Sequence, residues 1–348
     1  NYISKEWGQH IKKWVLISWI FLTIGIMLGS IWAYYELGWG GFWFWDPVEN
    51  VSLMPWLTLT ALLHCILVLE RRGVLTTWVV ILSITTFTLS MCGTFLVRSG
   101  ILNSVHTFAN DPTRGIFILI FLFTLIFLSL GVFFLFHKDN NKDSNNFFWL
   151  SKESSILVNN WFMMYFLSVV LIGTVYPIFL DVISAEKISV GPPFYQKLIA
   201  PFLAPFLLFM ALGLKLKWIK SKIENKNSLI IFLIISVILT FFILKNITTD
   251  LFFYTILISA AFFLFFSTSK ELFLKKFNNI SQAVAHFGFS LLILSILFNG
   301  ILSSEITTNI KVGERYNYNN EEIFFEKIEE KNESNFNSII GYFKVTND

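Results

Sequence analysis

The sequence is poor in charge and in cysteine, and each shortage excludes a class of protein. Charged residues make up 14% of the 348 positions and hydrophobic residues 55%, which is far from the composition of a soluble domain. Cys65 and Cys92 lie in apolar stretches and form no CxxC pair, so we predict small buried side chains without a redox role. The sequence also contains no phosphate-binding glycine loop, serine hydrolase triad or zinc finger.

Long apolar runs are what the sequence has in abundance. A helix needs about 20 apolar residues to cross a membrane, and repeated runs of about that length are present. We therefore predict an all-α polytopic membrane protein with about nine transmembrane helices within residues 1–302. Pro55, Gly115 and Pro201, together with Gly73, are predicted to mark span ends. The predicted spans are residues 14–34, 55–70, 76–97, 115–136, 157–180, 199–216, 228–245, 251–268 and 282–302.

Lysine and arginine are divided unevenly between two sets of connections. Sixteen of the 26 lie in segments 1–13, 70–75, 137–156, 215–227 and 269–280, and five lie in 35–54, 98–114, 181–198 and 245–250. Basic residues favour the cytoplasmic side. We therefore predict a bacterial inner-membrane protein whose N-terminus, in this chain, is cytoplasmic and whose C-terminus is periplasmic, with no nucleic-acid partner. Residues 303–348 are polar with short alternating stretches, which predicts a small β-rich periplasmic segment.

Two of the five histidines are predicted to lie at the same depth inside the membrane. His64 precedes the basic turn at residues 70–75 by six residues, and His286 follows Lys276 by ten. Two imidazoles at matching depth on different helices can ligate one iron, as in haem proteins. The alternative is that each is an isolated polar residue bonded within the bundle. His106 belongs to the outer connection 98–114, where a solvated loop histidine is the alternative.

Residues 36–50, ELGWGGFWFWDPVEN, combine aromatic rings, glycines and acids between two apolar runs. A buried core would not favour the acids, and a solvated loop would not favour the rings. A large, flat, apolar partner with polar edges satisfies both, because indole and phenyl rings can cover its face and glycines allow close approach. The alternative is an aromatic belt at the membrane interface. The acids Asp46 and Glu49 either fix the loop through backbone N–H groups or contact a partner.

Four stretches of the sequence resemble a known family. The stretches WGGFWFWDPVEN, LGSIWAYYELGWGG, GTFLVRSGILNSVHTFANDPTRG and AVAHFGFSLLIL are similar to the CcmF/NrfE family, the haem lyase subunits of system I cytochrome c maturation that carry the tryptophan-rich WWD signature. The resemblance implies that His64 and His286 ligate a resident haem b, and that His106 is one of two outer ligands of a second haem, the substrate. It also implies that this second haem is held by Trp39, Gly40, Gly41, Trp43, Trp45, Asp46 and Pro47.

The implied activity is covalent attachment of haem to the CxxCH thiols of apocytochrome c at the periplasmic face. The implied partners are a haem chaperone like CcmE, a CcmH-type thiol-reducing subunit, apocytochrome c and the lipid bilayer. No catalytic acid or base can be assigned. The family's other outer histidine precedes the first span here, so we expect residue 1 to lie inside a longer parent. Two alternative functions are a transmembrane haem exporter and a diheme electron-transfer subunit.

Overall fold

The computed structural model contains the predicted set of long apolar helices. It describes residues 3–37, 41–99, 112–136, 148–184, 188, 190–222, 226–245, 247, 251–273, 280–303, 308–318, 321–332, 334 and 337–347. Within those residues nine helices are long and apolar enough to cross a membrane, which confirms the all-α polytopic fold class. They are α1 (Lys5–Glu36), α2 (Pro47–Arg72), α3 (Thr76–Ser99), α4 (Pro112–Phe136), α5 (Lys152–Ser184), α6 (Pro192–Gly213), α7 (Lys226–Leu244), α8 (Leu251–Phe273) and α9 (Ile280–Leu302).

Several helices extend beyond the apolar runs that predict them. The span predicted at 55–70 belongs to α2, which begins at Pro47, so the predicted outer loop 35–54 is too long. Pro55 lies buried inside α2, and Gly115 and Pro201 lie inside α4 and α6, so the prediction that they mark span ends is wrong. Proline is tolerated inside such helices because neighbouring groups satisfy the freed backbone atoms. Gly73 does end α2, in the left-handed conformation with φ 74°.

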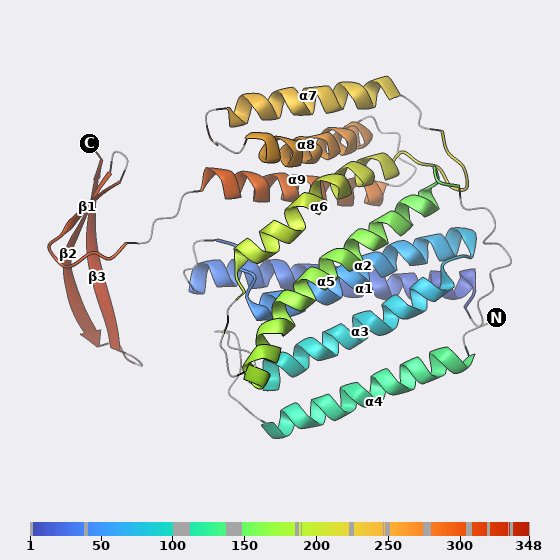
Figure 1. Ribbon diagram of the computed structural model, residues 1–348, viewed down its shortest axis with the longest axis horizontal. Coiled ribbons are helices and arrows are strands. Elements are labelled where there is room, and N and C mark those ends of the chain that lie inside the picture. The colour runs from blue at the N-terminus through green and yellow to red at the C-terminus, as the bar shows by residue number, and fades with distance from the viewer. Residues whose placement is uncertain are drawn as a thin grey trace. The chain divides into compact units, whose positions relative to one another are not determined.

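The helices fall into two groups joined by an oblique pair (Figure 1). Helices α1 to α4 pack in sequence, with α2 in contact with α1, α3 and α5. Helix α7 packs on α8, and α8 packs on α6. Helices α5 and α6 cross between the groups, so the packing runs from α2 through α5 and α6 to α8. Helix α2 is the most buried of the nine, which makes it the centre of the helical core.

Two tryptophans fix α1 against α2. The indole N–H of Trp19 donates to Thr60 Oγ1 at 2.9 Å, and the indole N–H of Trp56 donates to Thr23 Oγ1 at 2.9 Å. The two indoles also stack, with ring centroids 6.1 Å apart. Because each helix donates one indole hydrogen bond to the other, both polar N–H groups are satisfied within the apolar interior.

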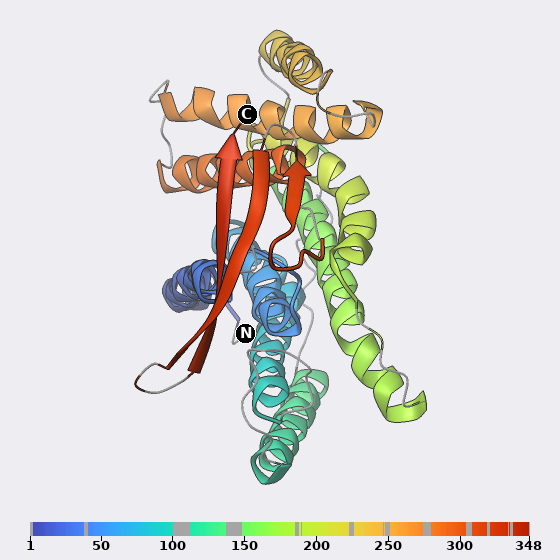
Figure 2. The same cartoon turned by 90° about the vertical axis from the view of Figure 1, so that its left-hand side faces the viewer.

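Residues 298–348 form a second compact unit, which contains a small antiparallel sheet (Figure 2). The strand order is β1 (Arg315–Tyr318), β2 (Glu321–Asn332) and β3 (Asn337–Asn347). Strands β2 and β3 pair from Glu321 with Asn347 to Asn332 with Asn337, with an irregularity between Phe325 and Lys327. Phe325 stacks on Phe343 with centroids 4.3 Å apart, which is the apolar centre of the sheet. The predicted β-rich character of the C-terminal segment is therefore confirmed.

Candidate functional site

The structure brings His64 and His286 together. Their ring centroids are 6.3 Å apart, and the ring planes are inclined by 80°. His64 belongs to α2 and His286 to α9. The two imidazoles therefore meet from two helices that are far apart in the sequence.

One nitrogen of each imidazole is held by the helix that carries it. His64 Nδ1 lies 2.8 Å from the carbonyl oxygen of Thr60, and His286 Nδ1 lies 2.7 Å from the carbonyl oxygen of Gln282. A carbonyl oxygen only accepts, so each Nδ1 donates, and in the neutral ring Nε2 keeps its lone pair. A backbone contact of this kind at the other nitrogen is how proteins orient histidines that bind metals.

The pair offers two nitrogen ligands and no larger ligand set. Over the ranges that the structure describes, no group of three or more His, Cys, Asp or Glu side chains is arranged to hold a metal ion. Two axial nitrogens are what a haem iron accepts from a protein, because the macrocycle supplies the remaining bonds. The arrangement of the pair is therefore suited to a haem iron and unsuited to a bare metal ion that needs four ligands.

The aromatic stretch leads directly into α2 through a capping box. Asp46 is the N-cap, its carboxylate accepts the backbone N–H of Val48 at 2.9 Å, and Pro47 is the first residue of the helix. Glu49 Oε2 accepts the N–H groups of Phe44 and Asp46 at 3.0 and 3.1 Å. Both acids therefore bond to backbone N–H groups, and together they fix how the stretch enters the helix.

Trp45 has a left-handed backbone, with φ 59°. That conformation costs about 1–2 kcal/mol for a residue with a Cβ atom, and two contacts hold it in place. The amide of Asn50 donates to the Trp45 carbonyl at 3.0 Å and to the Tyr195 hydroxyl at 2.9 Å. The rings of Trp45 and Tyr195 stack with centroids 4.3 Å apart and planes within 7°. Tyr195, from α6, thus fixes the orientation of one tryptophan of the stretch.

The remaining signature residues are only partly within the described chain. Gly41 lies against the ring of Phe44, and Trp43 meets Trp45 edge to face with centroids 6.0 Å apart. Trp39, Gly40 and His106 lie outside the described residues, so their predicted positions stay predictions. Pro47 and His64 are seventeen positions apart on α2, which corresponds to about 25 Å along the helix axis. The histidine pair and the aromatic stretch are therefore two separate sites.

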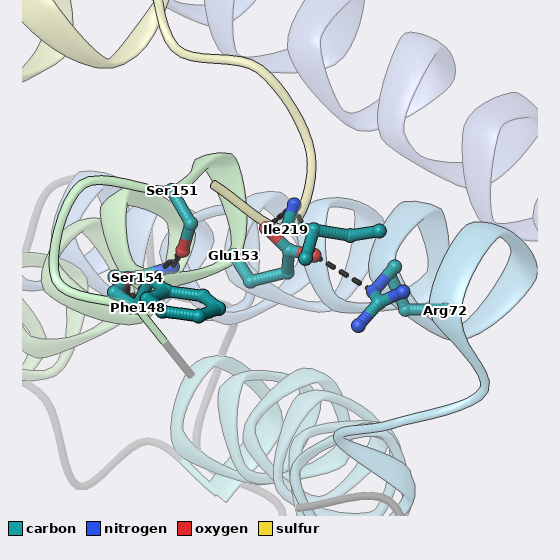
Figure 3. Close-up of polar contacts among 6 residues, drawn as sticks. All are labelled: Arg72, Phe148, Ser151, Glu153, Ser154 and Ile219. Atoms are coloured by element: carbon teal, nitrogen blue, oxygen red, sulfur yellow. Dashed lines mark hydrogen bonds and ion pairs between the residues drawn. The ribbon is translucent and has the colours of Figure 1, made fainter. Parts of the chain in front are cut away.

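A buried carboxylate ties together the helix ends at the His64 end of α2 (Figure 3). Glu153, at the start of α5, forms an ion pair with Arg72, whose Nε lies 2.8 Å away, and accepts the backbone N–H of Ile219 at 3.1 Å. Ile219 has φ 71°, which is rare for a β-branched residue, so this carboxylate stabilises a strained connection between α6 and α7. Nearby, the Ser154 hydroxyl donates to the Phe148 carbonyl at 2.8 Å. We call the end of α2, the start of α5, the connection between α6 and α7, the first turns of α9 and the neighbouring ends of α1 and α8 the basic end.

Comparison with known proteins places the chain in a family. Residues 3–102 match the family model described as Cytochrome C assembly protein. CcmF of Haemophilus influenzae, a cytochrome c-type biogenesis protein, is 36% identical over 350 residues, which cover 96% of this chain and 54% of that protein. A solved structure titled Cytochrome c Heme Lyase CcmF has a TM-score of 0.74 and 26% identity, covering 98% of this chain and 54% of that chain. The chain belongs to the CcmF/NrfE family.

Other members of the CcmF/NrfE family match a shorter part of the chain with higher identity. CycK of Bradyrhizobium diazoefficiens is 50% identical over 216 residues, which are 62% of this chain and 33% of that protein. NrfE of Haemophilus influenzae is 42% identical over 217 residues, which are 62% of this chain and 34% of that protein. The chain therefore spans between a third and about a half of the length of these relatives.

Three residues at these sites are absent from the sequence-based prediction. Tyr195 and Asn50 support Trp45, and Lys152 contacts the Gln282 side chain beside His286. The signal for Asn50 was available, because an amide inside an apolar helix next to a capping box calls for a buried partner. Tyr195 and Lys152 approach from helices far along the chain, so only the fold reveals them.

Proposed function

We propose that this chain is the membrane part of a haem lyase subunit of system I cytochrome c maturation. Family membership and the two separated sites support the proposal, and the histidine pair is the observation that carries it. The inner site would hold a resident haem b, and the outer site would receive a second haem as substrate. The chain would then present this second haem to apocytochrome c.

His64 and His286 fit a haem iron in distance and in tautomer. Imidazole nitrogens lie about 2 Å from a bound metal, so two rings on opposite sides of one iron have centroids roughly 6 Å apart. The observed separation of the ring centroids is 6.3 Å. The backbone carbonyls of Thr60 and Gln282 hold both Nδ1 atoms, which leaves both Nε2 atoms as ligands. A haem bound there supplies one-electron redox chemistry, which would reduce the substrate haem.

The outer site positions the substrate. The rings of the aromatic stretch would cover a face of the second haem, His106 would be one axial ligand, and Gly40 and Gly41 would allow close approach. Each cysteine thiol of the CxxCH segment adds across a vinyl group: sulfur bonds to one vinyl carbon and the proton goes to the other. The addition consumes no oxidant, and no acid or base of this chain is assigned to it. Positioning is the contribution of the protein.

The partners follow from this chemistry. A haem chaperone like CcmE would deliver the substrate, apocytochrome c would accept it, and a CcmH-type subunit would keep the thiols reduced. The chain is a multi-pass membrane protein. The distribution of lysine and arginine supports an orientation in the bacterial inner membrane with the basic end towards the cytoplasm and the aromatic stretch towards the periplasm.

The decisive test removes the inner ligands one at a time. His64→Ala and His286→Ala should each abolish the b-type absorbance of the purified protein, because one imidazole cannot hold the iron in a six-coordinate low-spin state. His10→Ala is the matched control, since His10 is exposed on α1, and it should leave the spectrum unchanged. A bis-histidine spectrum in both single variants would overturn the ligand assignment.

A second arm separates the outer site from the inner one. His106→Ala should keep the b-type spectrum and abolish covalent haem attachment to a c-type cytochrome, measured by haem staining. Normal attachment would contradict the outer site. Cells that lack the haem chaperone distinguish a haem lyase from a haem exporter. A lyase that accepts haem from the chaperone loses its outer haem there, whereas an exporter keeps it.

A further inference from the structure

Three cations at the basic end have a carboxylate partner. Lys12 pairs with Glu70 at 2.6 Å and Lys215 pairs with Glu271 at 2.5 Å. Arg72 pairs with Glu153, as described above. Each pair joins one helix to another helix or to the connection that follows another helix. These cations therefore have a structural explanation. A cation in this region that lacks a carboxylate partner needs a different explanation.

Lys152 is the exception closest to the histidine pair. In the described part of the chain no carboxylate lies within ion-pair distance of its ammonium, and its nearest polar contact is the neutral Gln282 Oε1 at 3.4 Å. It also lies over the Trp218 ring, 5.4 Å from the centroid. Gln282 also holds His286 through its backbone carbonyl, so this contact places the Lys152 ammonium near the histidine pair. Lys152 is therefore a half-buried charge beside both candidate ligands, held by weak neutral contacts.

A second positive charge strengthens the requirement for an anion. Arg71 acts electrostatically on Lys152, and it too has no carboxylate within ion-pair distance among the described residues. Two like charges brought together at a partly buried site repel each other unless an anion lies near them. Glu271 also acts on Lys152, but its carboxylate is already bound by Lys215. No carboxylate in the described part of the chain is therefore placed to neutralise Lys152 directly.

We propose that Lys152 binds a propionate carboxylate of the haem held by His64 and His286. The inference rests on the proposed function, because it presupposes a haem at this pair. A haem carries two propionates, and a carboxylate at the edge of an apolar site needs a cation with which to pair. Gln282 joins the two functions: its backbone carbonyl orients His286, and its side chain contacts Lys152. Lys152 is thus a positioning residue for the macrocycle that also sets its electrostatic environment.

The charge of Lys152 should favour the ferrous state, because the ferrous haem carries one positive charge fewer than the ferric haem. Lys152→Gln should shift the ferrous-to-ferric equilibrium about tenfold towards ferric, which is about 59 mV lower in midpoint potential for a one-electron couple. Lys152→Arg keeps the charge and should restore the wild-type potential. Lys12→Gln removes another cation of the same end, which pairs with Glu70 and does not contact Gln282, and it should shift the potential by less than Lys152→Gln does.

The experiment is a redox titration of the purified, haem-loaded full chain, followed by its b-type absorbance. An unchanged potential in Lys152→Gln, or an equal shift in Lys12→Gln, overturns the proposal while the His-dependent spectrum still supports the proposed function. A second measurement uses wild-type protein alone. Apo protein should bind haem at least about fivefold more tightly than haem dimethyl ester, whose propionates cannot pair with a cation. Equal binding overturns the proposal, whereas an absent wild-type haem spectrum overturns the proposed function itself.

Discussion

Tyr195 shows how one residue far from the aromatic stretch determines the geometry of that stretch. Its side chain is almost completely buried, and its ring lies between the Trp45 ring and Gly173 of α5. A Cβ atom added at Gly173 would lie 2.7 Å from the Tyr195 ring and hydroxyl, closer than real Cβ contacts. The absence of a side chain at Gly173 is therefore what allows Tyr195 to occupy the position on which Trp45 stacks.

Gly173→Ala should consequently destabilise the protein and displace Trp45. Overpacking of a buried contact of this kind typically costs about 1–3 kcal/mol. We expect a lower midpoint of thermal unfolding for the full chain in detergent, and weaker covalent haem attachment in cells. Gly131→Ala is the control, because a Cβ atom at Gly131 meets no neighbour within 4 Å. Equal unfolding midpoints for the two variants would contradict the role of the Gly173 contact.

At this scale the sequence predicts the proximity of the two histidines better than it predicts the residues that support Trp45. His64 and His286 could be selected because an ionisable side chain within an apolar span is rare and because their depths along two helices match. The partners of Trp45 could not be selected, because Asn50 and Tyr195 are 145 positions apart and meet only through the packing of α2, α5 and α6. Stacking and close packing of this kind leave no periodic pattern in the sequence.

At the scale of the element, the acids of the aromatic stretch act through the start of α2. Glu49 Oε2 accepts two backbone N–H groups, from Phe44 and Asp46. A glutamine at this position keeps an acceptor oxygen but removes the charge, and an alanine removes both. The two substitutions therefore separate a capping role from an electrostatic contact with a partner.

We expect Glu49→Gln to keep covalent haem attachment within about twofold of wild type, because a capping box accepts Gln as well as Glu. Glu49→Ala should reduce attachment and destabilise the chain by about 1 kcal/mol. Haem staining of a c-type cytochrome and the midpoint of thermal unfolding measure the two effects. If Glu49→Gln is as defective as Glu49→Ala, then the negative charge itself is required, and a partner contact replaces capping as the explanation.

Helix number and helix bounds differ in how far the sequence determines them. Hydropathy predicts the spans, because burial of about 20 apolar residues is a property of composition. The bounds depend on capping and packing, which is why α2 begins at Pro47 through its Asp46 cap although the apolar run predicts position 55. Pro55 is a breaker in a solvated helix, but within α2 it is buried among neighbouring helices.

At the scale of the whole molecule, the proposed function places the two sites near opposite faces of the membrane. The basic end contains the histidine pair and the ion pairs of Lys12, Arg72 and Lys215. The aromatic stretch is at the other end of α2, about 25 Å away along the helix axis. In the proposed function, an electron would pass from the inner haem to the outer substrate across this distance. Orientation in the membrane is therefore the property on which the proposed function depends most directly.

Impermeant thiol labelling of intact spheroplasts tests the orientation. His10 is exposed on α1 and Lys344 is exposed on β3, so cysteines placed there are accessible to a water-soluble maleimide. Lys344→Cys should label in intact spheroplasts, whereas His10→Cys should label only after lysis, because the basic segments favour the cytoplasm. The unsubstituted chain is the control: Cys65 is fully buried and Cys92 lies within α3, so neither should react. Labelling of His10→Cys before lysis would place the histidine pair near the periplasmic surface. Electrons would then have no membrane-spanning distance to cross, and the division between an inner redox haem and an outer substrate would be wrong.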